Sequence, residues 1–505
     1  MIKSQDIKYV IVQSGGKGTR MGHYAQNRPK CLVPVNGIPM ILNTMEVYKD
    51  RKIIIIGDHL VDVLDSYLDS FASNYDYQIV RTEELGTAGG LTKAVSFIPD
   101  GEPFIVTWSD LFFEEEQEFI LETELLVGLS NTFKCRWKYD DGFVNESSTE
   151  CGVSGFFAFW DKSKFNKLST EKSLVRGFLT EQYTDQNIST FYNHDCFEVG
   201  EKDRYEELIS RGPNHRFFNK VDIVEDLVYK RCIDFKYLSV HENEKNWYEF
   251  VSKKFDRIPK VYATDPLILQ RISGKHPWEL SEQKSDIVKN YCDTLDTLHN
   301  IDSTEGNMGD CMQVYFSKSY NRIGEVSKIV PLVHRSFINI NGKDCINPYY
   351  NLSYFEDIVS SISNVETYNI IHGDCTFSNA LVDDDCQVWL IDPRGTFGGT
   401  KIYGDKRYDW AKLYYSVSGN YDSINSKQFK VSVLSDCVDL EIKSNGYDEM
   451  SDYVISRSGM SKKEMLLINA TIWLSLTGYV KEDIDAAMYA FYKGCEIWTQ
   501  AFSQD

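Results

Sequence analysis

Near its start the chain reads Tyr9-Val-Ile-Val-Gln-Ser-Gly-Gly-Lys-Gly-Thr-Arg20, a compact apolar segment that runs into a glycine-rich one. This pattern predicts a buried β-strand that ends in a turn facing a phosphate. Further strands are predicted at 52–57 and 103–108, and the residues between the strands have helical spacing. Alternating strands and helices indicate an α/β fold with a parallel sheet. Ligands of such sheets bind beyond the carboxyl ends of the strands, where the glycine-rich turn and Asp110 would lie.

The composition is that of a large globular protein. The chain has 505 residues, of which 42% are apolar, and this length predicts two large domains or about three ordinary ones. Asp and Glu outnumber Lys and Arg by 75 to 54, which gives a net charge of −21. That charge repels nucleic acid and anionic lipid, so we expect no nucleic-acid partner. Any phosphate-bearing substrate must be held by local cations.

Membrane and secretion signals are not seen in the sequence. No apolar run reaches the length of about 18 residues that a membrane span needs, so we expect no membrane insertion. No apolar segment follows Met1 as it would in a secretion signal, and we expect a cytoplasmic protein. The 12 cysteines form no CxxC pair, which favours reduced and mostly buried thiols over disulfides or structural zinc.

The glycine-rich segment Gly15–Arg20 fits neither the P-loop spacing nor the dinucleotide fingerprint. What remains is a turn whose backbone N–H groups can approach an anion, with Arg20 and Lys30 as cations for a triphosphate. The small residues of 84–90 offer a surface against which a flat base could lie. Asp110, at a predicted strand end, is a candidate ligand of Mg²⁺, although a turn carboxylate is the default reading of such a residue alone.

Taken together, these segments resemble the sugar-phosphate nucleotidyltransferases, also called NDP-sugar pyrophosphorylases. The family pattern is a GGxGTR loop, a PK-x-L segment, an LGTAG segment and an Asp at a strand end. Its counterparts here, in the same order, are Gly15–Arg20, Pro29–Leu32, Leu85–Gly89 and Asp110. The resemblance covers roughly residues 8–210. The segment Leu32–Met40 is similar to that of the hexose- and heptose-1-phosphate enzymes.

This resemblance implies a Rossmann-like domain of the glycosyltransferase-A type. In the implied reaction, a phosphate monoester attacks the α-phosphorus of CTP, UTP or GTP and pyrophosphate leaves, with Arg20 and Lys30 as the catalytic cations. Mg²⁺ would be held by Asp110 and by Glu198, which stands where the family often has a second carboxylate in a D-x-G segment. The implied nucleotide-binding residues are Ser14, Gly15, Gly16, Gly18, Thr19, Gly86 and Thr87.

A second constellation lies far along the chain, at Ile370–Asn379 and Val388–Gly395, where a polar loop separates two apolar runs. A kinase needs one Asp to accept the proton of the substrate hydroxyl, an Asn five residues later to reach Mg²⁺, and another Asp after the next strand to hold the metal on the phosphates. Asp374, Asn379 and Asp392 meet this specification. The spacing HGDxxxxN followed by IDPRG is a strong signal.

The second constellation resembles the aminoglycoside phosphotransferase and choline kinase group, which shares the protein-kinase fold. The resemblance covers about residues 214–505 and implies a bilobal α+β domain that uses Mg²⁺ and ATP. Lys230 is the candidate phosphate-binding lysine and Glu244 would orient it through an ion pair, while a solvated strand lysine remains the alternative. The segment Leu267–Ser273 is similar to the hinge that binds adenine. We assign Asp409 to structure, as a buried carboxylate that braces the catalytic loop.

We expect a domain boundary near the turn-forming cluster Arg211–Asn214. The predicted domains are 1–212 and 213–505, and the second divides into lobes of about 213–275 and 276–505. The last 90 residues look helical. Their expected core residues are Trp473, Met488, Phe491 and Trp498.

The two constellations suggest consecutive reactions, because a kinase makes a phosphate monoester and a nucleotidyltransferase consumes one. The expected function is phosphorylation of a sugar at its anomeric hydroxyl, followed by formation of an NDP-sugar for polysaccharide or cell-surface glycan synthesis. The alternative is an amino alcohol such as choline, phosphorylated and then joined to a cytidylyl group. A binding or regulatory module with degenerate sites is a third hypothesis, which the presence of all the motif residues disfavours. The expected partners are these small molecules and nucleotides, and a homo-oligomer is left open.

Overall fold

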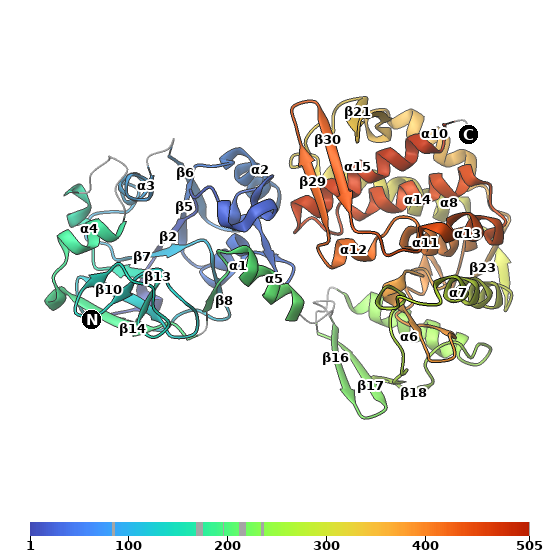
Figure 1. Cartoon of the computed structure of the whole chain (residues 1–505), viewed down its shortest axis with the longest axis horizontal. Coiled ribbons are helices and arrows are strands. Elements are labelled where there is room, and N and C mark those ends of the chain that lie inside the picture. Colours follow the sequence, from blue (N-terminus) through green and yellow to red (C-terminus); the bar gives the residue numbers. More distant parts are fainter. Residues whose placement is uncertain (83–85, 168–174, 195, 212–218, 234–236, 504–505) are drawn as a thin grey trace. The chain divides into compact units, whose positions relative to one another are not determined.

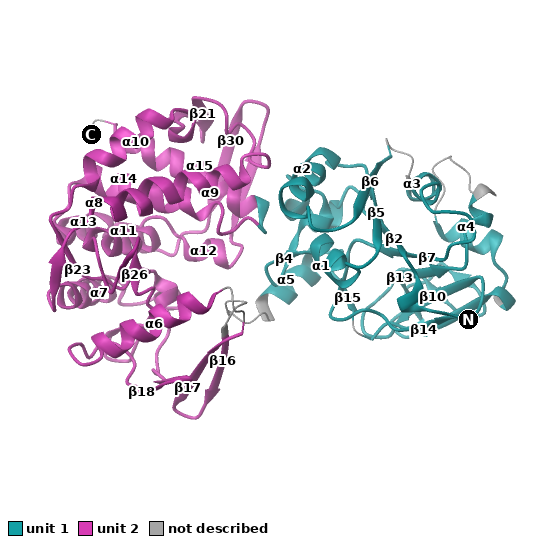
Figure 2. Cartoon of the chain, turned by 180° about the vertical axis from the view of Figure 1, so that it is seen from behind, with its two compact units in different colours: residues 1–212, 482–484 teal, residues 213–481, 485–505 magenta. Residues whose placement is uncertain are grey.

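The computed structural model describes residues 1–505 except 83–85, 168–174, 195, 212–218, 234–236 and 504–505. The chain forms two compact units (Figure 1, Figure 2). Unit 1 comprises residues 1–212 together with 482–484, and unit 2 comprises 213–481 together with 485–505. Among the described residues, no helix combines the length and the apolar character of a membrane span.

Unit 1 is a Rossmann-like α/β unit built on one twisted sheet with the strand order β12-β11-β13-β7-β2-β5-β6; β10 pairs with β13 and β14. Its elements are β2 (Tyr9–Gln13), α1 (Met40–Val47), β5 (Lys52–Gly57), α2 (Val61–Phe71), β6 (Tyr77–Arg81), α3 (Gly86–Val95), β7 (Phe104–Trp108), β8 (Leu111–Phe113), β10 (Leu125–Ser130), β11 (Lys138–Tyr139), β12 (Phe143–Val144), β13 (Gly152–Phe159), α4 (Val175–Gln182), β14 (Ile188–Tyr192), β15 (Cys196–Glu198) and α5 (Lys202–Arg211).

The centre of this sheet is parallel, as predicted. Tyr9 of β2 stands opposite Lys52 of β5 and Phe104 of β7, and β6 continues the parallel set beyond β5. The prediction did not extend to β13, which runs antiparallel to β7 and makes the sheet mixed. Antiparallel strands at the side of a parallel sheet are common in α/β folds, since a later strand of the chain can add to the sheet in the opposite direction.

Apolar runs explain why these strands lie at the centre. Residues 53–56 of β5 are four consecutive isoleucines that are 0% exposed, as a strand covered on both faces requires. Helix α3 packs on the same core through Ala88 and Leu91. A Cβ on Gly90 would lie 2.9 Å from Cγ2 of Ile56, so glycine at this position lets the helix backbone approach the strand closely.

Unit 2 begins with a four-stranded antiparallel sheet of order β16-β17-β19-β18. Its strands are β16 (Asn219–Val224), β17 (Leu227–Cys232), β18 (Val261–Thr264) and β19 (Leu267–Gln270), and α6 (Leu238–Val251) packs against it. The remainder is mainly helical (Figure 1). Its larger elements are α7 (Lys284–His299), α9 (Lys318–Val326), α10 (Leu352–Ser363), β23 (Thr367–Ile370), β24 (Ala380–Val382), β25 (Val388–Leu390), α11 (Lys406–Val417), α12 (Asp422–Asn425), α13 (Ser451–Ser458), α14 (Lys462–Leu476) and α15 (Ile484–Gln500).

The expectation that the last 90 residues are all helical is wrong. Strands β29 (Phe429–Val433) and β30 (Cys437–Ile442) form an antiparallel pair in that region. Their sequences alternate apolar and polar side chains with a period of two, which favours a strand over a helix. The core residues expected there are buried at 1% exposure or less: Trp473, Met488, Phe491 and Trp498.

All 12 cysteines are free thiols, and eight of them are buried. This agrees with the prediction of reduced, mostly buried cysteines.

Candidate functional site

The glycine-rich turn follows β2. At two of its glycines, Gly15 and Gly18, an added Cβ would lie very close to neighbouring side chains. Gly18 has a φ of +65°, and a Cβ there would lie 3.0 Å from the Cβ of Ala25 and 3.3 Å from that of Lys30. A Cβ on Gly15 would lie 3.2 Å from the Cβ of Asp58, whereas Gly16 has open space around it. The turn therefore presents bare backbone on one side and packs against Lys30 on the other.

Lys30 and Asp110 form an ion pair at the carboxyl end of the sheet. The Nζ of Lys30 donates to Oδ2 of Asp110, and both side chains are largely buried. Asp110 directly precedes β8, which pairs with β15 so that Leu111 stands opposite Glu198. The N–H of Val199 donates to the Asp110 carbonyl at 2.8 Å. This pairing brings Glu198 to the same edge as Asp110.

Gly200 shows how closely the two carboxylates approach. A Cβ on Gly200 would collide with Oε1 of Glu198 and would lie 2.6 Å from Oδ2 of Asp110. Arg204 of α5 donates to Oε2 of Glu198 and so holds that side chain in place. The sequence singled out both carboxylates but missed Gly200 and Arg204, whose roles depend on the β8–β15 pairing.

The two carboxylates fit a Mg²⁺ ion. Oδ1 of Asp110 is a buried oxygen without a hydrogen-bond partner among the described residues. Mg²⁺ prefers such hard oxygen ligands and is typically held by one or two carboxylates, with substrate phosphates and water completing its shell. The described part of the chain holds no cluster of three or more His, Cys, Asp or Glu suited to a metal. Asp110 and Glu198 are only two ligands, so they do not form such a cluster by themselves.

The other predicted residues of the first site lie at its border. Arg20 donates to Glu201 at 2.6 Å in an exposed ion pair, and Glu201 follows three residues after Glu198, the last residue of β15. Thr19 begins the short 3-10 segment after Gly18. The N–H of Ser14 donates to the carbonyl of Ile56 at 3.1 Å, which ties the start of the turn to β5. Gly86 and Thr87 begin α3, whereas Glu84 and Leu85 of the same motif lie outside the described residues.

In unit 2, Lys230 is buried between two carboxylates. Its Nζ lies 2.5 Å from Oε1 of Glu244 on α6 and 2.7 Å from Oδ1 of Asp392. Burial alone would lower the pKa of Lys230, but Asp392 and Glu244 raise it above its usual value. The predicted contact between Lys230 and Glu244 is thus present. Asp392 has a φ of +59°, a left-handed conformation that is uncommon for residues other than glycine.

Asp374 lies in the loop after β23 and contacts two cations. Its Oδ2 accepts from Nε of Arg394 at 3.3 Å, and its Oδ1 lies 3.0 Å from Nζ of Lys412. The side-chain amide of Asn379 donates to the Asp374 carbonyl at 2.9 Å. The structure therefore brings the two residues together, although the contact uses the backbone of Asp374. Sequence reasoning missed Lys412, which comes 38 positions after Asp374 and belongs to no recognised motif.

Asp409 braces this loop, as predicted. Its carboxylate is 0% exposed and accepts 2.8 Å hydrogen bonds from the backbone N–H groups of His372 and Gly373. The Nε2 of His299 lies 3.1 Å from the same carboxylate. Burial would raise the pKa of Asp409, but the contacts with His299 and His372 hold it below its usual value. A charged carboxylate thus fixes the backbone immediately before Asp374.

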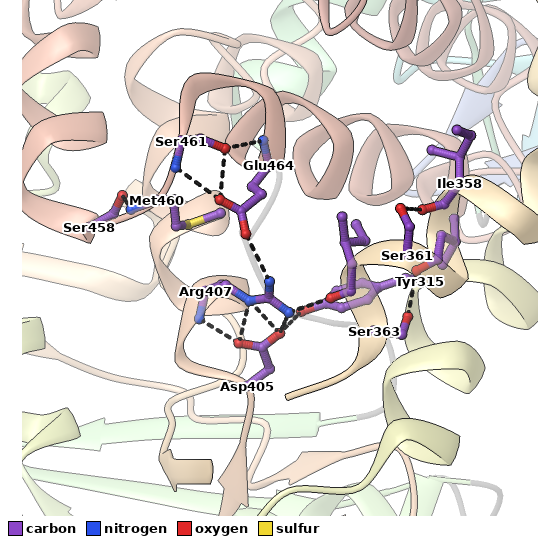
Figure 3. Close-up of polar contacts among 12 residues, drawn as sticks. Tyr315, Ile358, Ser361, Ser363, Asp405, Arg407, Ser458, Met460, Ser461 and Glu464 are labelled. Atoms are coloured by element: carbon purple, nitrogen blue, oxygen red, sulfur yellow. Dashed lines mark hydrogen bonds and ion pairs between the residues drawn. The ribbon is translucent and has the colours of Figure 1, made fainter. Parts of the chain in front are cut away.

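Figure 3 shows Asp405, the residue directly before α11, whose carboxylate accepts from the N–H of Arg407 and caps the start of this helix. Arg407 donates through Nε and Nη2 to Asp405, and its Nη2 also donates to the Ile362 carbonyl at 2.6 Å. Tyr315 donates its hydroxyl to Asp405 at 2.9 Å, and Glu464 of α14 accepts from Arg407 at 3.4 Å. These contacts of Asp405 and Arg407 are structural.

Each candidate site has a buried thiol directly beside one of its charged residues. Cys31 follows Lys30, Cys375 follows Asp374, and both are 0% exposed. Burial raises the pKa of Cys31 to about 11 and that of Cys375 well above its usual value. Neither thiol is poised as a nucleophile, because the thiolate is the reactive form.

The comparison with known families identifies one domain of the chain. Residues 10–118 match the model of the MobA-like NTP transferase domain. This match covers the glycine-rich turn, Lys30 and Asp110. Unit 1 therefore carries a MobA-like NTP transferase domain.

Curated relatives match about a quarter of the chain. A protein named bifunctional protein GlmU from Methanococcus maripaludis is 31% identical over 124 residues, which are 24% of this chain and 29% of the relative. Mannose-1-phosphate guanylyltransferase 1 from Arabidopsis thaliana is 32% identical over 120 residues, 22% of this chain and 33% of the relative. The chain thus spans about a third or less of these relatives. Among solved structures, HddC from Yersinia pseudotuberculosis aligns with a TM-score of 0.35 and 21% identity, over 40% of this chain and 98% of that one.

Proposed function

We propose that the chain is a bifunctional enzyme in which unit 2 phosphorylates a small hydroxyl compound and unit 1 transfers a nucleotidyl group from an NTP to the resulting phosphate. The acceptor is a sugar and the product an NDP-sugar. The observation that carries the proposal is that each unit gathers a lysine and two carboxylates that come from separate segments of its sequence. Unit 1 brings Asp110 and Glu198 beside Lys30, and unit 2 brings Glu244 and Asp392 to Lys230.

In unit 1, the bare backbone after β2 binds the triphosphate, and Lys30 and Arg20 neutralise its charge. The nucleophile is an ionised phosphate oxygen of the acceptor, so the reaction needs no general base. Asp110 and Glu198 would hold Mg²⁺, which would supply charge stabilisation during the transfer. Arg204 keeps Glu198 in place, and the ion pair with Asp110 keeps Lys30 at the end of the sheet. The relatives that are named as a guanylyltransferase and as GlmU support this assignment of the reaction.

In unit 2, the fold we propose is the bilobal kinase-like one, with residues 213–275 as the smaller lobe and 276–505 as the larger. Lys230 binds phosphates of ATP and Glu244 orients it. Asp374 accepts the proton of the acceptor hydroxyl as the oxygen attacks the γ-phosphorus, and ADP leaves. Asp392 and Asn379 would hold Mg²⁺, which supplies neutralisation of the phosphate charge. Asp409 positions the loop that carries Asp374.

The test measures both half-reactions on the full chain. The protein is incubated with Mg-ATP, each NTP and a panel of sugars and sugar phosphates, and ADP and pyrophosphate are assayed separately. Asp374→Asn should abolish ADP formation and leave pyrophosphate release from a supplied sugar 1-phosphate unchanged. Asp110→Asn should have the opposite effect. Pyrophosphate without ADP in every mixture would contradict the kinase, and loss of both activities in either variant would contradict separate sites.

A further inference from the structure

Four basic side chains gather at and beside Asp374, and we call them the cationic cluster: Lys318, Arg322, Arg394 and Lys412. Arg394 and Lys412 contact the Asp374 carboxylate directly at 3.3 and 3.0 Å. Lys318 and Arg322 stand four positions apart on α9, so they share one face of that helix. Lys318 lies within electrostatic range of the other three cations and of Asp374.

The cluster is built into unit 2 by backbone contacts. The N–H of Arg394 donates to the His372 carbonyl at 2.9 Å, so this residue is tied to the loop of Asp374. Arg322 donates to the carbonyl of Ser475 on α14 at 2.7 Å, and its guanidinium lies 5.8 Å from the ring centroid of Tyr479. Lys412 lies on α11, the helix that also carries Asp409. Elements distant in sequence thus converge on one carboxylate.

The positive charge of the cluster is not balanced by its neighbours. Lys318 makes no hydrogen bond or ion pair with any described residue, and Arg322 has no ion pair within the described part of the chain. Burial lowers the pKa of Lys318 well below its usual value, and repulsion from Arg322, Lys412 and Arg394 lowers it further. Arg322, Arg394 and Lys412 face one carboxylate and leave a local surplus of positive charge in a chain whose net charge is −21. Lys318 adds an amine whose charged form is disfavoured by its surroundings and would be favoured by a bound anion. Unpaired charge that is partly removed from water is costly, so this surplus indicates a place for an anion.

In the proposed function, Lys230 binds the phosphates of ATP, so the cationic cluster is not needed for them. Lys230 holds the position assigned to them, beside Asp392 and Glu244. The cationic cluster is associated with Asp374, the residue assigned to the acceptor hydroxyl. Arg394 and Lys412 both contact the carboxylate of Asp374, at 3.3 and 3.0 Å. An anion that binds the two cations would release the carboxylate toward the hydroxyl.

We propose that the acceptor phosphorylated by unit 2 carries, besides its hydroxyl, an anionic phosphate or carboxylate group that the cationic cluster binds. This inference rests on the proposed kinase function of unit 2. A phosphate ester carries close to two negative charges and meets guanidinium groups in a fork-like geometry, so it matches the surplus better than a carboxylate does. The same cluster disfavours choline and other amino alcohols, which would bring one more positive charge among four.

The first test compares matched acceptors on the full chain with Mg-ATP. A hexose, its 6-phosphate, the corresponding hexuronic acid and choline are assayed for ADP formation. We expect kcat/KM for an anionic acceptor to exceed that of the neutral hexose by about 100-fold or more, since two charged hydrogen bonds contribute at this scale. The phosphate and carboxylate arms identify the anion. ADP formation that favours the hexose or choline would overturn the inference and leave the kinase proposal standing, whereas the absence of ADP in every arm would count against the kinase.

The second test removes one cation. Lys318→Met keeps the length of the side chain and should raise KM for the anionic acceptor at least about tenfold while KM for ATP stays within about twofold. Lys318→Arg should restore most of the affinity. Lys406→Met is the matched control, because Lys406 is an exposed lysine of α11 outside the cluster. A rise in KM for ATP alone would assign the cluster to ATP and overturn the inference.

A binding measurement keeps the inference testable if no acceptor of the panel is turned over. Inorganic phosphate and hexose 6-phosphate are titrated calorimetrically into the full chain with Mg-ADP at saturation. We expect binding by the wild type that Lys318→Met weakens at least about tenfold and Lys406→Met leaves unchanged. No binding by the wild type, or equal binding by wild type and Lys318→Met, would overturn the inference.

Discussion

Single residues account for most of the chemistry that we assign, and Lys230 is the clearest case. Its ammonium group is buried between Glu244 and Asp392, so neutralising it leaves two carboxylates without their shared cation. We expect Lys230→Met to lower kcat/KM for ATP at least about 100-fold, since preorganised charges contribute this much to phosphoryl transfer. ADP formation at varied ATP concentration measures the effect.

The control for this prediction separates catalysis from stability. Breaking a buried ion pair by removing one partner costs about 3–5 kcal/mol, so Lys230→Met should also lower the melting temperature. Lys230→Met combined with Glu244→Gln should recover part of the stability and none of the activity. A double variant that regains ADP formation would show that Lys230 acts only in folding.

Gly200 offers a matched test of the first site. Because a Cβ at this position meets both Glu198 and Asp110, we expect Gly200→Ala to lower nucleotidyl transfer at least about tenfold. Gly177→Ala is the control, since a Cβ on that helical glycine meets no atom within 4 Å. Pyrophosphate release reports the first site, and ADP formation should stay normal in both variants. Full pyrophosphate release by Gly200→Ala would mean that the two carboxylates do not need their observed spacing.

The buried carboxylate of Asp422 should make the free energy of unfolding depend on pH. Burial raises the pKa of Asp422 to about 6, above the value of about 3.9 expected in the unfolded chain. The folded state therefore binds this proton more tightly, and its contribution to stability is complete below about pH 4 and is lost as the pH rises through about 6. The shift corresponds to roughly 3 kcal/mol.

Asp422→Asn removes this titration, so the variant should gain unfolding free energy relative to wild type between about pH 4.5 and about pH 7.5. Denaturant melts at the two pH values measure the gain. The hydrogen bond that Ser378 donates to Asp422 can persist with an amide oxygen. A difference between variant and wild type that does not change with pH would contradict the raised pKa.

At the scale of the element, helix α11 carries three residues with separate tasks. Arg407 belongs to the hydrogen-bond network of Figure 3, Asp409 holds the backbone before Asp374, and Lys412 contacts the Asp374 carboxylate. Arg407 links the first turn of this helix to the carbonyl of Ile362 and to Glu464. We expect Arg407→Met to destabilise unit 2 by about 3 kcal/mol or more, because Asp405 is 1% exposed and would lose its cation. Thermal melts measure the loss, with Lys406→Met as a control that should melt like wild type. Equal melting temperatures of Arg407→Met and Lys406→Met would contradict a stabilising role for the contacts of Arg407.

The elements also show what local sequence determines. The apolar runs of β2, β5 and β7 were predictable because each pattern is complete within about ten residues. The hairpin β29–β30 had an equally complete period-two pattern and was missed because long helices surround it. The antiparallel direction of β13 was not predictable, since it depends on how the chain returns to the sheet rather than on any local pattern.

The candidate sites were predictable only where a motif names the residue. Lys30, Asp110, Asp374 and Asp392 belong to recognisable spacings, and the structure places them at the two sites; their catalytic roles stay predictions. Arg204 and Lys412 contact Glu198 and Asp374 and belong to no motif. Their contributions depend on strand pairing and helix packing, which bring together residues that spacing alone cannot relate.

For the whole molecule, the proposed function predicts two reactions joined by a diffusible phosphate. If the sites work independently, equimolar Asp110→Asn and Asp374→Asn chains should together form the NDP-sugar that neither forms alone. The mixture should show a lag that shortens with protein concentration, because the intermediate must pass between molecules. Product formation followed by chromatography tests this. Failure of the mixture, with each variant keeping its remaining activity, would show that the intermediate passes only within one chain.

Cys31 lies beside Lys30 and Cys375 beside Asp374, and both thiols are buried. The rate at which each thiol is alkylated therefore reports how often its own candidate site opens. A thiol that is fully covered and held protonated is alkylated only during the brief moments when its surroundings come apart. Mass spectrometry resolves modification of Cys31 from that of Cys375, so the opening of the two centres can be timed in the same sample. A nucleotide that binds at one candidate site should slow alkylation of the cysteine at that site and leave the alkylation rate of the other cysteine unchanged.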